Sequence, residues 1–332
     1  MADLKFIECE ERTLPENIKN GSFTDYMFMM YKRGEGEWYR NTLFPCAQFI
    51  GPSNVTGGAC GAVAYEDIRV SLDKDGKAVF TKADVVLSSL AEKAKTLGLP
   101  ELDKVYAAFA LRELVKVEKQ FLTQDSYFVA RLTLSGMDPF CEYPCNSGLF
   151  TITLQWFEGG LSEGGNMTFT VCPVLSPVYG TAVYAGASYT AKAQATAMGY
   201  SDALWLDCIY KKYILGASGA DVFFRIDDEV ITPANEHSLM TNTVCALLSE
   251  WGLSPVKRKI SVDELEACFE EGKVTEIFMV DNRKIIVPVA SVEMGEKEYT
   301  LKTGKLSIKL YDSLRNIERG VLLSPAYKTE RI

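Results

Sequence analysis

The stretch "SFTDYMFMMYKRGEGEWYRNTLFP" at residues 22–45 decides the fold. Residues 26–31 within it form an apolar and aromatic run, which is typical of a buried strand. Similar strand-like runs recur at 76–80, 127–134, 149–157, 167–174, 203–207 and 221–226. Helical periodicity is found at 83–97, 102–122, 190–198, 242–251 and 261–271. Strands mixed with helices along the whole chain favour an α/β or α+β fold over a helical bundle.

Local signals indicate where some of these elements begin and end. Ser261 and Glu264 form a capping box at a helix start, and Gly272 is placed to end that helix. The segment "EGGLSEGG" at 158–165 is rich in glycine and predicts a linker. A chain of 332 residues suits two domains. We therefore expect a first domain at 1–155, an interdomain loop at 156–166 and a second domain at 167–332.

Composition and charge exclude several partners. The chain is 47% hydrophobic and carries a net charge of −9. An acidic chain without basic clusters argues against nucleic acid and against an anionic membrane surface. The first twenty residues carry charges throughout, and no apolar run reaches the length of a membrane-spanning helix. These features predict a cytoplasmic protein that does not insert into membranes.

The stretch at 22–45 resembles the opening of the branched-chain aminotransferases, which are class IV, fold-type IV pyridoxal-phosphate enzymes. In that family an "FTDHMF" strand precedes a loop that ends in "GEW". Further segments agree with the family in order and spacing, at 65–80, 199–214, 221–233, 250–278 and 310–320. The resemblance implies a two-domain class IV aminotransferase fold, with a small α/β domain and a larger pseudo-barrel domain. It also implies a homodimer with the cofactor between the domains.

The family's Schiff-base lysine stands five residues before a tyrosine in "KxGGNY". Here the matching segment is "GTAVYAGASY" at 180–189, which places Tyr184 at the lysine and Tyr189 at the motif tyrosine. A phenol cannot form an imine, so we expect no covalently bound pyridoxal phosphate, and we expect Tyr184 to point into the cleft. Thr181 to Tyr184 has the pattern of a buried strand before a turn and a helix. The next lysine, Lys192, is expected to point away from the cleft.

Other positions that the family uses for its cofactor also differ. The family's glutamate that contacts the pyridine nitrogen of the cofactor corresponds to Gly216, and a family threonine corresponds to Gly219. Asp221 is the one acidic residue in this segment. The family's arginine that binds the cofactor phosphate corresponds to Ser88 or Ser89. The family's tyrosine that lines the cofactor pocket corresponds to Cys60. The family's second phosphate loop corresponds to residues 239–244, where Thr243 is kept and Thr241 or Asn242 could cap the helix. Its third phosphate loop corresponds to residues 279–284, where Arg283 and Lys284 replace small residues of the family. The resemblance thus implies pyridoxal phosphate, whereas these residues predict no cofactor and no catalytic residue.

Three functions remain open at this stage. The first is a catalytically inactive homologue that serves as a homodimeric structural, assembly or storage protein. The second is a repurposed cleft that binds a small molecule or performs chemistry without pyridoxal phosphate, using residues such as Arg283, Lys284 and His237. The third is a pyridoxal-phosphate transaminase whose motifs are shifted. His237 is the only histidine, so neither a catalytic triad nor a metal site is expected.

Overall fold

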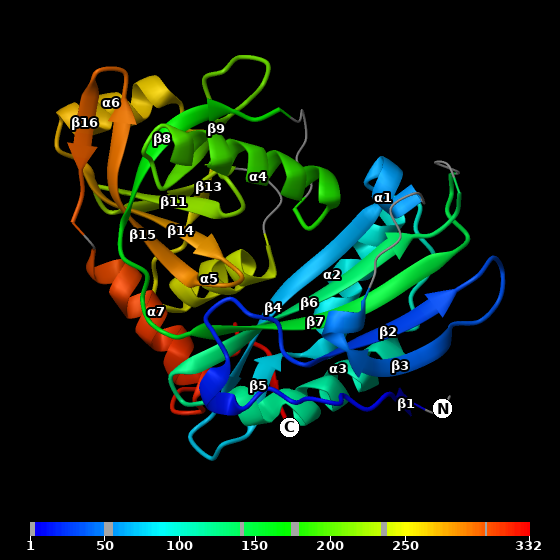
Figure 1. Cartoon of the computed structure of the whole chain (residues 1–332). Helices are drawn as coiled ribbons and strands as arrows, with labels where there is room; N and C mark the ends of the chain where they lie inside the picture. The colour runs from blue at the N-terminus through cyan, green and yellow to red at the C-terminus, as the bar shows by residue number, and fades with distance from the viewer. Residues whose placement is uncertain (1–3, 50–55, 140–142, 174–178, 234–237, 303) are drawn as a thin grey trace.

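The computed structural model describes residues 4–49, 56–139, 143–173, 179–233, 238–302 and 304–332. His237 lies outside these residues. The described chain forms two sheets with helices packed against them (Figure 1). No helix in the described ranges is long and apolar enough to cross a bilayer.

The first sheet contains eight strands within the described ranges. In spatial order they are β1 (Lys5–Phe6), β3 (Tyr39–Pro45), β2 (Tyr26–Lys32), β7 (Gly148–Glu158), β6 (Ser126–Gly136), β4 (Val63–Leu72), β5 (Ala78–Thr81) and β17 (Thr329–Arg331). Neighbouring strands are antiparallel except for the parallel pair β1 and β3. The stretch at 22–45 supplies β2 and β3, and β2 lies inside this sheet, as its apolar run predicts.

Helices α2 (Ala83–Thr96) and α3 (Lys104–Glu118) pack on the first sheet. Their apolar residues, including Leu87 and Leu111, join strand residues such as Phe28 and Phe128 in one core, where all four are fully buried. Shorter helices in this half are η1 (Pro15–Asn17), η2 (Cys46–Gln48), α1 (Thr56–Cys60) and η3 (Lys119–Phe121). The core therefore lies between the sheet and the α2–α3 pair, while other residues of the sheet remain available to face the second half.

The second sheet is a half-barrel. In spatial order its strands are β10 (Ile214–Ala217), β9 (Asp202–Leu206), β8 (Gly165–Val171), β15 (Ile285–Met294), β14 (Val274–Asp281), β11 (Asp221–Ile226), β12 (Glu229–Thr232) and β13 (Val256–Lys257), and β16 (Lys297–Thr300) pairs with β15. Its helices are α4 (Ala182–Ala197), α5 (Leu239–Glu250), α6 (Val262–Glu270) and α7 (Lys305–Glu318).

Both faces of the central strands in this sheet are buried. Phe224 and Ile277 point into a core that also contains Leu265 of α6, whereas Phe223 and Phe278 point into a core shared with α5 and α7. Strands covered on both faces read as continuous apolar runs rather than as alternating ones. This explains why "DVFFRI" at 221–226 carries so little polar alternation.

Most of the predicted elements are present. The seven strand-like runs correspond to β2, β5, β6, β7, β8, β9 and β11, and the five periodic segments to α2, α3, α4, α5 and α6. The capping box is confirmed, because the Ser261 side chain accepts a hydrogen bond from the Glu264 amide at 3.1 Å. Gly272 follows with a φ of 68°, the left-handed conformation that favours glycine at a helix end.

One local prediction is wrong. Thr181 to Tyr184 is not a strand, because α4 begins at Ala182, eight residues before the predicted helix. Thr181 is the N-cap, and its hydroxyl accepts the Tyr184 amide at 3.3 Å. Only Thr181 retains strand character, through an isolated bridge to Ala64 of β4. The cap hydrogen bond thus outweighs the β propensity of a short apolar run.

Residues 159–164 connect β7 to β8 without a helix or strand, and the interdomain loop at 156–166 stays a prediction. The chain later returns from the second half, and β17 pairs with β5 at the edge of the first sheet. The two sheets are a feature of the structure, whereas the exact domain bounds stay a prediction.

Candidate functional site

A cavity of about 550 Å³ lies where the two halves face each other. Its residues come from β4, β6, α4, the turn before β11 and the turn between β14 and β15. We call it the cleft cavity, and its lining residues are Tyr65, Asp67, Arg131, Tyr179, Tyr184, Ala185, Ser188, Tyr189, Lys192, Ser218, Gly219 and Arg283. The cleft is therefore open, with charged and aromatic walls.

One face of α4 forms a side of the cavity. Tyr184, Ser188 and Lys192 follow each other at intervals of four residues, which places them on one side of a helix. All three line the cavity. The prediction that Lys192 points away from the cleft is therefore wrong, because it assumed a helix that begins too late. The Lys192 ammonium lies 3.7 Å from the Asp202 carboxylate, and the lysine side chain is 54% exposed.

Tyr184 is held in an aromatic group at the base of α4. Its ring centroid lies 5.0 Å from that of Tyr179 and 5.4 Å from that of Trp205. Only 8% of Tyr184 is exposed, yet it lines the cavity, as predicted. Burial raises the pKa of the Tyr184 and Tyr179 hydroxyls well above the usual range. Both phenols are therefore protonated at neutral pH and can act as hydrogen-bond donors.

The first sheet contributes a paired arginine. The Arg131 guanidinium forms two hydrogen bonds of 2.7 Å with the Asp67 carboxylate, an arrangement that fixes its plane. Its Cζ lies 4.5 Å from the centroid of the Tyr65 ring. Burial, together with the Asp67 charge, raises the pKa of Tyr65 to about 12. This wall is preorganised, because the Arg131 and Asp67 side chains hold each other in a fixed orientation.

The second sheet contributes a less constrained arginine. Arg283 lies in the turn between β14 and β15, and one of its nitrogens is 3.3 Å from the Asp281 carboxylate. The Arg283 side chain is 47% exposed. The Asp281 charge raises the pKa of Arg283, so the guanidinium stays charged. Its backbone carbonyl accepts a 2.6 Å hydrogen bond from Arg69 of β4, which ties the turn to the first sheet.

The predicted site residues fall into two groups. Tyr184, Tyr189, Gly219 and Arg283 line the cleft cavity. The other predicted positions are not among its lining residues, namely Cys60, Ser89, Gly216, Thr243 and Lys284.

Those other positions have local roles. Ser89 donates a hydrogen bond to the buried Glu66 carboxylate, which also pairs with Lys93. Thr243 donates to the Leu239 carbonyl within α5. Cys60 ends α1, Gly216 lies in β10, and Lys284 is an exposed residue of the 282–284 turn. The cap of α5 is Ser238, which accepts the Thr241 amide, so the proposal of Thr241 or Asn242 as the cap is also wrong.

Several lining residues were missed by the sequence reasoning, namely Tyr65, Asp67, Arg131, Tyr179, Ser188 and Ser218. Asp67 and Arg131 lie directly opposite each other on neighbouring strands, in the register that pairs β4 with β6. Opposite charges at facing positions of predicted strands are a usable signal, but only once the strand order is known.

The resemblance implies pyridoxal phosphate, and the cavity offers a test of fit. Lys192 is the one lysine among the described lining residues, and it is paired with Asp202. Asp67 is committed to Arg131, while the Asp221 carboxylate accepts Ser238 and Thr241 and is not among the lining residues. The loss of the family's cofactor site stays a prediction. That Tyr184 replaces the lysine stays a prediction.

Comparisons with known proteins support the resemblance. No family model matches the chain. Branched-chain-amino-acid transaminase 1 of Bacillus subtilis is 26% identical over 97% of this chain and 96% of its own length. Branched-chain-amino-acid aminotransferase of Mycolicibacterium smegmatis is 25% identical over 90% of this chain and 87% of its own length.

Solved structures agree on the fold. Branched-chain aminotransferase from Thermoproteus uzoniensis with norvaline has a TM-score of 0.73 at 17% identity, covering 92% of this chain and 99% of its own. The branched-chain amino acid aminotransferase from Thermobaculum terrenum in its PLP form has a TM-score of 0.72 at 17% identity. The match covers 94% of this chain and 98% of that structure's chain.

These findings correct one functional prediction. The chain was expected to be a catalytically inactive structural, assembly or storage protein, and this prediction is wrong, because the named relatives are aminotransferases over nearly the whole chain. The cleft is also open rather than filled by side chains. The homologues and structural neighbours of this chain are branched-chain aminotransferases, fold-type IV pyridoxal-phosphate enzymes, and the chain has their class IV fold.

Proposed function

We propose that this chain is an enzyme that binds and acts on a branched-chain amino acid or the matching 2-oxo acid in the cleft cavity. One observation carries the proposal: charged donors and aromatic rings surround an open cavity in a chain whose relatives are named for this substrate class. Ligand sites are usually clefts with apolar walls and a few polar groups that fix orientation.

Arg283 is the residue that we assign to the substrate carboxylate. Arg131 is less suited to this role, because both of its hydrogen bonds already go to Asp67. The Arg283 guanidinium contacts the Asp281 carboxylate through one nitrogen at 3.3 Å, so it can add a second charged partner. The protonated hydroxyls of Tyr179 and Tyr184 offer neutral donors nearby, and their rings provide an apolar wall.

The test compares two neighbouring residues. Calorimetric titration with L-leucine and with 4-methyl-2-oxopentanoate would be performed on the unaltered protein, on Arg283→Gln and on Lys284→Gln. Lys284 is a matched control, because it is exposed in the same turn and does not line the cavity. We expect Arg283→Gln to weaken binding by at least tenfold, since a charge-assisted hydrogen bond to a carboxylate contributes about 1.5–3 kcal/mol. Lys284→Gln should change it less than twofold.

Turnover is tested separately, by following glutamate formation from L-leucine and 2-oxoglutarate with and without added pyridoxal phosphate. Absence of binding by either ligand would refute the substrate class. Binding without turnover under any condition would refute the enzyme. A homodimer and a cytoplasmic location stay predictions from the resemblance and the sequence, and light scattering would test the first.

A further inference from the structure

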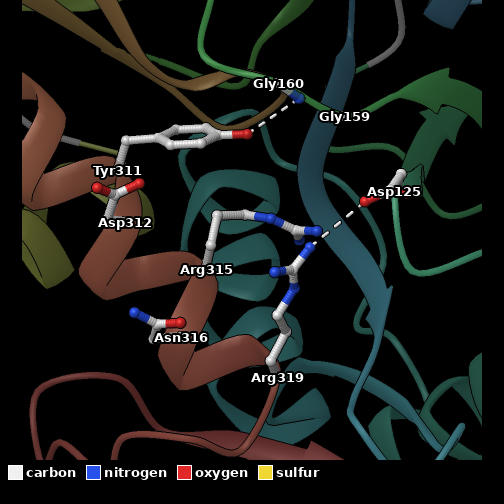
Figure 2. Close-up of a pocket in the computed structure, with 8 residues that line it drawn as sticks. All are labelled: Asp125, Gly159, Gly160, Tyr311, Asp312, Arg315, Asn316 and Arg319. Carbon is white, nitrogen blue, oxygen red and sulfur yellow. Dashed lines mark hydrogen bonds and ion pairs between the residues drawn. The ribbon is translucent and has the colours of Figure 1, made fainter.

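A second cavity, of about 370 Å³, lies beside α7 and away from the residues that line the cleft cavity. Its residues come from the turn before β6, the segment that connects the two sheets, and α7 (Figure 2). We call it the α7 cavity, and it is lined by Asp125, Gly159, Gly160, Tyr311, Asp312, Arg315, Asn316 and Arg319. The Tyr311 hydroxyl accepts the Gly160 amide at 3.0 Å, which fixes the connecting segment against α7.

Two guanidinium groups converge in this cavity. Arg315 and Arg319 lie side by side and both donate to the Gln124 carbonyl, at 3.2 and 3.3 Å (Figure 2). Arg315 is only 6% exposed and pairs with Glu318 at 2.5 Å. The Glu318 carboxylate compensates Arg315, so the second guanidinium, that of Arg319, is the one that can take a further negative charge.

Arg319 is poorly compensated. Its closest carboxylate belongs to Asp125, at 3.6 Å, and the Asp125 side chain is 93% exposed. Such a surface pair contributes little. In addition, the Arg319 Nε is buried and has no hydrogen-bond partner among the described residues. The Arg319 side chain as a whole is 38% exposed and lines the cavity, so its terminal nitrogens are the donors that a ligand can reach.

We propose that the α7 cavity is a binding site for a small anion, a carboxylate or a phosphate, held by Arg319 and Arg315. The guanidinium fork of Arg319 presents donors in the geometry that both kinds of oxyanion accept. Asp312 also lines the cavity and is exposed, so its negative charge opposes the anion without filling the site. This site shares no lining residue with the cleft cavity, so the inference does not depend on the proposed function.

The test uses inorganic phosphate and 4-methyl-2-oxopentanoate as probes in calorimetric titrations of the full chain. Variants would be Arg319→Gln, Arg319→Lys, Asp312→Asn and, for the cleft, Arg283→Gln. We expect Arg319→Gln to weaken one class of sites by at least tenfold and Arg319→Lys to retain part of the affinity. Asp312→Asn should tighten the same class roughly two- to fivefold, because it removes a like charge.

The two probes distinguish the source of the anion. Stronger binding of phosphate assigns the site to phosphorylated ligands, whereas stronger binding of the oxo acid assigns it to carboxylates. The inference is overturned if neither probe binds at about 10 mM, a concentration well above typical weak affinities. It is equally overturned if a well-folded Arg319→Gln protein titrates like the unaltered one. If only Arg283→Gln weakens binding of the probes, all binding takes place in the cleft cavity. That result would refute the α7 site and would still support the proposed function.

Discussion

Replacing Glu318 by glutamine should strongly destabilise the protein, because it removes a buried charge that two arginines share. Glu318 is 2% exposed, and its carboxylate lies 3.4 Å from the Arg69 guanidinium and 2.5 Å from that of Arg315. The Ser71 hydroxyl donates to it at 3.0 Å. Glutamine has nearly the same shape, so no cavity forms, but the two buried arginines lose their shared counter-charge.

The expected cost is about 3–5 kcal/mol, the typical penalty for removing one partner of a buried ion pair. A chain of 332 residues unfolds with an entropy of roughly 0.7 kcal/mol per kelvin, so this corresponds to a fall in Tm of about 4–7 °C. The assay is differential scanning calorimetry at pH 7. Glu113→Gln serves as the control, because Glu113 forms an exposed pair with Lys116 that should contribute less than about 1 kcal/mol.

The pH dependence gives an independent check. Burial alone raises the pKa of Glu318, but the guanidiniums of Arg69 and Arg315 outweigh it and hold this pKa below its usual value. A depressed carboxyl pKa stabilises the fold above the unfolded pKa, near 4.3, and this stability is lost as the pH falls through the folded pKa. The difference between the unaltered protein and Glu318→Gln should therefore shrink in acid. Equal Tm values for Glu318→Gln and Glu113→Gln at pH 7 would refute the reasoning.

Three further predictions concern other parts of the fold. Burial raises the pKa of Glu118 to about 7 despite the Arg12 charge, so stability should decline as the pH rises from about 4.5 to 7, by at most roughly 3 kcal/mol. Glu118→Gln should flatten this decline in urea unfolding measured across that range, and an unchanged slope would contradict the assignment. Ser261→Ala removes the cap of α6 and should cost about 1 kcal/mol, whereas an unchanged Tm would show that the cap is dispensable. Tyr184→Ala removes a buried ring and should cost about 3 kcal/mol in the same calorimetry, while Tyr184→Phe should cost much less; similar losses for both would contradict the packing role.

The elements that the sequence predicts well are those whose signals are local. The capping box of Ser261 and Glu264 needs only four residues to be recognised. The strands β6 and β7 are rich in β-branched and aromatic residues, which favour a strand over a helix. The start of α4 was missed because its first turn, from Ala182 to Tyr184, is too short to show a helical period. Its cap, Thr181, also makes a strand-like bridge to β4.

The candidate site was only partly predictable. Tyr184, Tyr189, Gly219 and Arg283 were found because they lie in segments that match the family closely. The pair of Asp67 and Arg131 was missed because it depends on the register between two strands 64 residues apart. The sequence of either strand alone does not determine the register in which the two strands pair.

The position of β17 has a consequence for synthesis of the protein. Residues 329–331 close the edge of the first sheet next to β5, although that strand ends at Thr81. While the chain is still emerging from the ribosome, β5 has exposed backbone groups on its outer side and must wait about 250 residues for its neighbour. At typical translation rates this wait lasts tens of seconds, and during it the outer edge of β5 is open to pairing with other chains.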